Sequence, residues 1–143
     1  MKNILHLTIL FSILSATTIN IPADYPTIQE GIDVSDNGDT VLVTDGVYYE
    51  NLSINREITL ASHSIIDGDL SHRDATVIDG SSYNENYGPF GSCVLFLPSD
   101  NGDAINPKLT GFTIQNGQGT GVRETINDTT TIVYYMGGGL MIW

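Results

Sequence analysis

The sequence predicts an all-β solenoid, a fold in which short strands from successive turns of the chain stack on one another. The prediction rests on the stretch 39–60, DTVLVTDGVYYENLSINREITL, which holds three short β-type runs, each bounded by a turn signal. The stretch has no helical periodicity, and the 15 glycines of the chain suit a turn-rich all-β fold. Strands this short bury little core alone, so we expect them to stack on similar segments elsewhere in the chain.

The three runs within 39–60 are separated by turns. Val41 and Val43 recur with a period of two, which predicts a half-buried strand. Asp45-Gly46 predicts a turn, because glycine adopts positive φ without steric cost. The second run, 48–54, is interrupted by the polar pair Glu50-Asn51, and the third run is 58–60.

A short helix is predicted before these runs, from Thr27 to about Val34. Thr27 and Glu30 have the spacing of a capping box, in which Thr27 caps the helix and Glu30 reaches back. The first coil of a solenoid must be shielded from water and from edge pairing. We therefore expect residues 17–38 to form an N-terminal cap and residues 39–143 to form the coils.

Turn signals recur along the rest of the chain. Asx-Gly pairs begin at six positions, and the intervals from 45 to 67 and from 79 to 101 are both 22 residues, which is compatible with solenoid coils. The Ile-Asp-Gly pattern of 66–68 recurs at 78–80, and a polar excursion is expected at 118–130. Asx-Gly pairs are also typical of hairpins, so an antiparallel sandwich is the alternative fold.

Residues 1–16 predict a secretory signal peptide. Lys2 supplies a positive start, 4–14 is mainly apolar, and the small residues Ser15 and Ala16 suit cleavage. The apolar run is too short to span a bilayer. We expect a secreted or cell-surface protein without a membrane span; the alternative is a buried N-terminal strand or helix.

The net charge of the chain is −12, which excludes nucleic acids and anionic membranes as partners. An acidic polysaccharide is also disfavoured unless a cation bridges it. The single cysteine, Cys93, permits no intramolecular disulfide and lies in an apolar run, where we expect a buried thiol.

The stretch 21–60 resembles the opening of right-handed parallel β-helix proteins of the pectin lyase-like superfamily. The resemblance rests on four segments, which are Pro26–Gln29, Gly38–Val41, Gly46–Asn51 and Ile58–Leu60. It extends less specifically to residue 143, and it implies a right-handed parallel β-helix with a short N-terminal capping helix. Because 140–143 is apolar and uncapped, we expect the coils to be incomplete at the C-terminus and the chain to be a fragment of a longer protein.

The resemblance implies a fold and leaves the activity open, since the superfamily contains both enzymes and adhesins. The catalytic segments of pectinesterases are absent here, and we predict no catalytic residue. The expected function is a secreted or cell-surface scaffold that contacts a polysaccharide or cell-surface glycan. The alternative is the N-terminal part of a polysaccharide lyase, pectinesterase or glycoside hydrolase whose catalytic coils lie beyond residue 143.

An aromatic loop at 81–91 is the candidate carbohydrate contact. Tyr83, Tyr87 and Phe90 lie in a Gly/Asn-rich segment, and amphipathic rings on such a loop suit contact with sugar faces. The alternative is an ordinary loop whose rings pack on the coil below.

Acidic residues supply two further candidates. Asp67, Asp69 and Asp79 are candidate acid–base residues, although Asp67 and Asp79 each precede glycine and are typical of turns. The tetrad 36–39 is repeated at 100–103, where Asp100 and Asp103 are candidate ligands for Ca²⁺. The alternative for both tetrads is a solvated turn.

Overall fold

A computed structural model describes residues 15–82, 90–126, 130–136 and 138–142 of the chain. Nearly all of the predicted signal peptide lies outside this part. The described residues are rich in strands, and their helices are short. The elements are β1 Thr18–Ile21, α1 Ile28–Val34, β2 Thr40–Val43, β3 Gly46–Tyr48, β4 Leu52–Ile54, β5 Thr59–Ser62, α2 Ser64–Asp67, α3 Ser71–Ala75, β6 Thr76–Asp79, the 3₁₀ turn η1 Gly80–Ser82, β7 Phe90–Gly91, β8 Val94–Phe96, β9 Lys108–Thr110, β10 Thr113–Gln115, β11 Gly119–Ile126, β12 Thr130–Met136 and β13 Leu140–Ile142.

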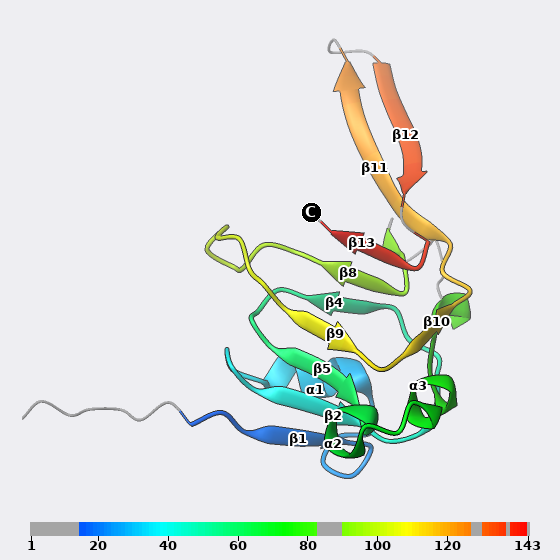
Figure 1. Cartoon of the computed structure of the whole chain (residues 1–143). Coiled ribbons are helices and arrows are strands. Elements are labelled where there is room, and N and C mark those ends of the chain that lie inside the picture. The colour runs from blue at the N-terminus through cyan, green and yellow to red at the C-terminus, as the bar shows by residue number, and fades with distance from the viewer. Residues whose placement is uncertain (1–14, 83–89, 127–129, 137, 143) are drawn as a thin grey trace, which may run out of the picture.

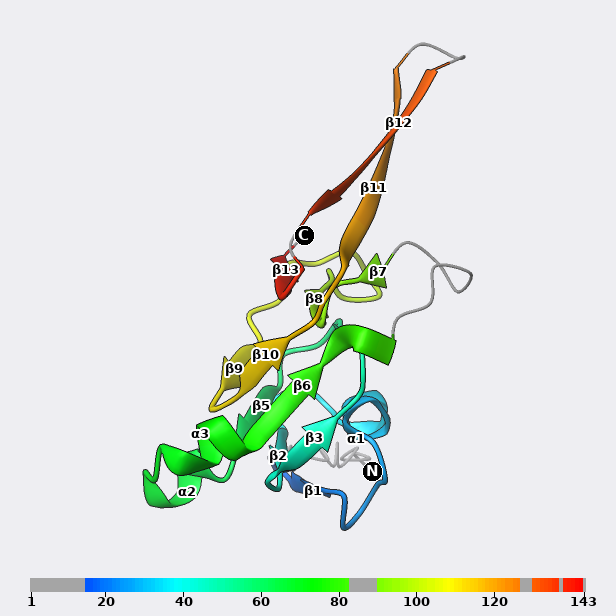
Figure 2. The same ribbon diagram turned by 90° about the vertical axis from the view of Figure 1, so that its right-hand side faces the viewer.

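Parallel strands form three separate sheets, which the chain visits in a fixed order. The first sheet has the order β1-β2-β5-β9, the second β3-β6-β10 and the third β4-β8-β13. From β2 onward the chain passes from the first sheet to the second, then to the third, and returns to the first. Figure 1 shows the strands of the first and third sheets stacked one above another, and Figure 2 shows the second sheet. These parallel pairings contradict the antiparallel sandwich.

The predicted runs of 39–60 make up one passage through all three sheets. Thr40 of β2 pairs with Thr59 of β5, so the passage takes 19 residues to return to its starting sheet. The second predicted run divides between two sheets, because Glu50 and Asn51 form the corner between β3 and β4.

The core is built from ladders of aliphatic side chains, one residue from each stacked strand. In the first sheet Ile19 pairs with Val41, Val41 with Leu60, and Leu60 with Leu109. Val41 and Leu60 are fully buried. Leu42 is also buried, so β2 is covered on both faces and the prediction of a half-buried strand is wrong there.

Helix α1 lies between β1 and β2, where the chain skips the second and third sheets. It begins one residue after Thr27, whose Oγ1 accepts a hydrogen bond from the backbone of Glu30, as predicted. Its buried residues Ile28 and Ile32 join the core. The helix therefore packs against β1, β2 and β4 and contributes to the core beside the first passage.

Two segments form structures that the sequence pattern did not specify. Within the expected polar excursion at 118–130, residues Gly119–Ile126 form strand β11, which pairs antiparallel with β12 in a long ribbon that projects from the parallel sheets (Figure 1). The segment 64–67 is helix α2, and its Ile65 and Ile66 are exposed. The recurring Ile-Asp-Gly pattern therefore forms a strand end only at β6.

Candidate functional site

A polar pocket lies at the corner where the chain passes from the third sheet to the first. Three successive passages contribute to it, through the segments that precede β2, β5 and β9. The pocket, called the corner pocket below, encloses about 290 Å³, and every lining residue is polar or charged. Its lining residues are Ser35, Asp36, Asn37, Asn55, Arg56, Ser99, Asp100 and Asn101.

Side-chain amides connect the three passages at this corner. Asn37 Oδ1 accepts a hydrogen bond from the backbone of Glu57, at 2.9 Å. Asn55 Nδ2 donates to Asp100 Oδ1, at 2.8 Å. Each bond joins one passage to the next, so these residues hold the turns in register and bring the two acidic tetrads to the same corner.

Arg56 is the cationic residue of the corner pocket, and its guanidinium is held by the C-terminal end of α1. Nη1 donates to the backbone oxygens of Asp33, at 3.0 Å, and Ser35, at 2.6 Å. Carbonyl groups at the end of a helix favour a cation. The positive charge of Arg56 therefore compensates the partial negative charge of the carbonyl groups at the C-terminal end of α1.

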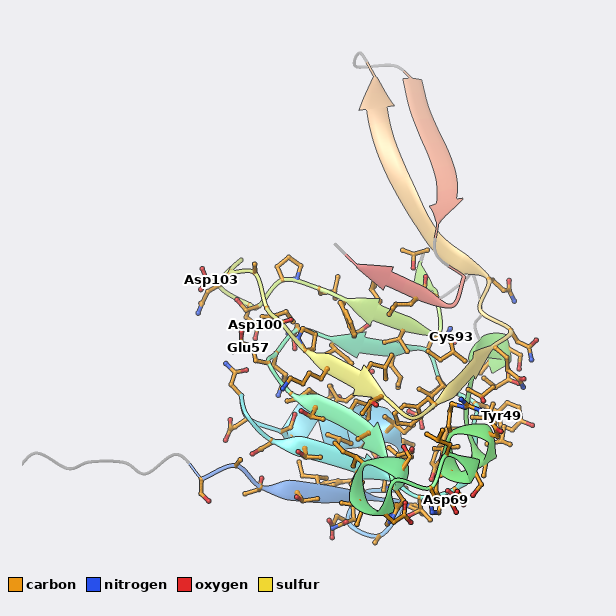
Figure 3. All side chains as sticks on the ribbon, viewed as in Figure 1. Tyr49, Glu57, Asp69, Cys93, Asp100 and Asp103 are labelled. Carbon is orange, nitrogen blue, oxygen red and sulfur yellow. The ribbon has the colours of Figure 1, made fainter. Side chains whose placement is uncertain are left out.

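Asp100 and Asp103, the candidate Ca²⁺ ligands, lie near the same corner as Glu57 (Figure 3). Asp100 accepts the bond from Asn55, and the backbone of Asp103 exchanges hydrogen bonds with Ser99. Within the described ranges, no group of three His, Cys, Asp or Glu side chains is placed to hold a metal ion. A calcium site at these two residues stays a prediction.

The aromatic candidates for carbohydrate contact lie at the margin of the described chain. Tyr83 and Tyr87 fall outside the described residues. The backbone of Phe90 begins strand β7, where it pairs with Thr120 of β11. The sugar-contact prediction for this loop therefore stays a prediction.

A second polar cluster surrounds His72 on helix α3. His72 Nδ1 lies 2.6 Å from Asp45 Oδ1, and Nε2 lies 3.1 Å from Asp67 Oδ2. The hydrogen bond to Asp45, followed by the charges of both carboxylates, raises the pKa of His72. The imidazolium form can donate to both carboxylates at once, so this cluster ties α2 and α3 to the turn before β3.

Two of the carboxylates considered for acid–base chemistry, Asp67 and Asp69, accept hydrogen bonds from backbone amides of the turns in which they lie. Asp67 accepts from the backbone of Asp69, and Asp69 from that of Ser71, each at 2.8 Å. These backbone hydrogen bonds lower the pKa of both carboxyl groups. A general acid in glycoside cleavage needs a raised pKa, so the geometry favours the turn role.

Asp79 is buried at the end of β6 and serves as a hydrogen-bond acceptor. Its Oδ1 accepts from the backbone of Ser81, and its Oδ2 accepts from the side-chain amides of Gln115 and Asn116. The hydrogen bonds from Ser81 and Gln115 are the main reason that the pKa of Asp79 lies far below its usual range. The carboxylate links β6 to β10 and the turn after it.

Cys93 is buried, as predicted, and its Sγ donates to the backbone oxygen of Gln115 at 2.9 Å. Burial raises the pKa of this thiol. A buried thiol with a raised pKa is a poor nucleophile.

Comparison of this chain with protein family models, with curated proteins and with solved structures finds no match. In the part of the chain that the structure describes, none of the helices has the length and apolar character needed to cross a bilayer.

The corner pocket as a whole was not predicted from the sequence. One signal for it existed, because the identical tetrads at 36–39 and 100–103 both precede strands of the first sheet. No sequence feature marks Asn55 and Arg56 as pocket residues, since only the stacking of the passages places them between the tetrads.

Proposed function

We propose that this chain forms part of a secreted or cell-surface parallel β-helix that acts as a scaffold and contacts carbohydrate. The observation that carries the proposal is the fixed order in which the chain visits three parallel sheets. A right-handed β-helix of the pectin lyase-like kind would have this strand order. Secretion follows from the signal peptide expected at residues 1–16.

The polar side chains of the described residues support a scaffold more than a catalyst. Asn37, Asn55 and Asp79 connect neighbouring passages, and Asp67 and Asp69 are bound within turns. Groups committed to such bonds stabilise the stack. The alternative is a lyase, esterase or hydrolase with catalytic coils beyond residue 143. Only the resemblance to the pectin lyase-like superfamily supports this alternative.

A glycan array probed with the folded full chain tests the proposal. We expect binding to at least one class of neutral or acidic glycan, and loss of that binding when the chain is thermally unfolded. Absence of binding to every glycan on the array would contradict the carbohydrate-contact role. Accumulation of the chain in the cytoplasm of its host would contradict the secreted or cell-surface location.

A further inference from the structure

The corner pocket has the size and lining of a site for a small polar ligand. Its volume of about 290 Å³ lies just below the range for small-molecule sites, roughly 300–1,000 Å³. The lining contains carboxylate, amide, hydroxyl and guanidinium groups but no apolar side chain. An apolar ligand would therefore gain little from entering it.

Several polar groups of this pocket are still available for a ligand. Asn37 uses its Oδ1 for the bond to Glu57, which leaves its two Nδ2 hydrogens. Asp100 uses Oδ1 for the bond from Asn55, which leaves Oδ2. The exposed side chains of Asp36 and Asn101 make no hydrogen bond to another described residue, and both line the pocket.

The available groups match the hydroxyl groups of a ligand better than anionic groups. Carboxylate oxygens accept hydrogen bonds from hydroxyls, and amides both donate and accept. An anionic ligand would meet Asp36 and Asp100, while Nη1 of Arg56 is already engaged by the end of α1. The chain's net charge of −12 adds to this repulsion.

The stacking of the passages places the available groups at two levels of the pocket. Asn37 precedes β2 and Asn101 precedes β9, and the turn that holds Asn55 lies between them in the strand order. Neighbouring parallel strands lie about 4.8 Å apart, so the two levels are separated by about 10 Å. A glycan of one or two rings that enters the pocket can therefore meet donors and acceptors from both levels.

We propose that the corner pocket binds one or two units of a neutral, hydroxyl-rich glycan, through Asp36, Asn37, Asp100 and Asn101. The inference rests on the proposed carbohydrate-contact function and names its site and ligand class. It places the contact at the corner between the third and first sheets, apart from the aromatic loop.

Isothermal titration calorimetry with the full chain tests the inference. The probes are cellotetraose, xylotetraose and mannotetraose as neutral glycans, with trigalacturonate as the anionic comparison. Asp36→Ala and Asn101→Ala remove available groups without breaking a hydrogen bond of the fold. Asn106→Ala, an exposed asparagine outside the pocket, is the matched control.

We expect the unmodified chain to bind a neutral probe, each pocket variant to weaken that binding up to roughly tenfold, and Asn106→Ala to leave it unchanged. Neutral binding that both pocket variants leave unchanged would overturn the site and leave the proposed function standing. Binding of trigalacturonate alone would overturn the ligand class, again with the proposed function intact. Absence of binding both here and on the glycan array would overturn both proposals.

Discussion

Gly80 lies where the end of β6 packs against the start of β8. A Cβ atom at this position would lie 2.7 Å from Cys93 Sγ and 3.0 Å from the Cα of Gly117. Neither Gly80 nor Gly117 adopts positive φ, whereas Gly38, Gly68 and Gly102 do. The Asx-Gly pairs therefore serve two purposes, since some form left-handed turns and others allow close packing between passages.

We expect Gly80→Ala to lower the free energy of unfolding by roughly 1–3 kcal/mol, because the methyl group overpacks the contact with Cys93. Urea denaturation measures the change. Gly139→Ala is the matched control, since its Cβ would meet its nearest neighbour, on Ile114, at an ordinary 3.7 Å. Combining Gly80→Ala with Cys93→Ala should recover part of the lost free energy of unfolding. Equal losses for Gly80→Ala and Gly139→Ala would contradict this account.

At the scale of the element, hydrogen bonds that involve side chains attach the N-terminal end of helix α1 to the first complete passage. The carboxylate of Glu50 accepts hydrogen bonds from the backbone of Ile28 and Gln29, each at 3.0 Å. The side-chain amide of Gln29 donates to the backbone oxygen of Ser53 and accepts from its nitrogen. Gln29 thus takes the place of a neighbouring strand at the edge of β4, which protects that edge from pairing with other chains.

We expect Gln29→Ala to destabilise the chain by roughly 1–3 kcal/mol, since two hydrogen bonds to Ser53 are lost. The amide of Ser53 should also exchange its hydrogen faster, as measured by NMR. Gln118→Ala, at an exposed position, should change neither property. Unchanged exchange at Ser53 in the Gln29 variant would show that the helix does not protect this strand.

The α2–α3 segment is attached to the parallel sheets in part by the bonds of His72 to Asp45 and Asp67. The folded pKa of His72 is raised above its ordinary 6.5, so its stabilising contribution is fully present below that pH. The contribution is lost as the pH rises through the folded pKa. Asp67, with its lowered pKa, remains ionised well into the acid range.

We therefore expect His72→Gln to lower the Tm at about pH 5 and to have a much smaller effect at about pH 9. Differential scanning calorimetry across this range measures the difference from the unmodified chain. His63→Gln is the matched control, because its ring lies near His72, with centroids 5.9 Å apart. A difference between the chains that grows with pH would contradict the assigned direction of the pKa shift.

At the scale of the whole molecule, stability depends on ladders that run across all the passages. Leu60 lies between Val41 and Leu109 in the first sheet and is fully buried. In stacked folds each layer is stabilised by its neighbours, so a defect in a middle layer weakens the contacts on both sides of it.

We expect Leu60→Ala to lower the free energy of unfolding by roughly 2–5 kcal/mol, through lost burial and the cavity left behind. Ile66→Ala, at a side chain that is 69% exposed, should change it by about 0.5 kcal/mol or less. Chemical denaturation of both variants measures the contrast. Similar small effects at both positions would mean that the ladder of the first sheet is not part of the core.

The sequence predicted helix α1 and the strands of 39–60 because these depend on local signals. Thr27 caps its helix within one turn, and the alternating pattern of β2 lies within four residues. It did not specify helix α2 at 64–67 or strand β11 at 119–126. In both segments the short pattern fits more than one structure, so the local sequence alone does not select one of them.

The sequence by itself determined that this chain is strand-rich, turn-rich and strongly acidic, since composition and short-range pattern are properties of neighbouring residues. Only the tertiary structure decided that the strands pair in parallel and that the two acidic tetrads meet around Asn55 at one corner. The physical reason is that pairing between passages joins residues 19 or more positions apart, and the hydrogen bonds that select the register form only when the passages stack.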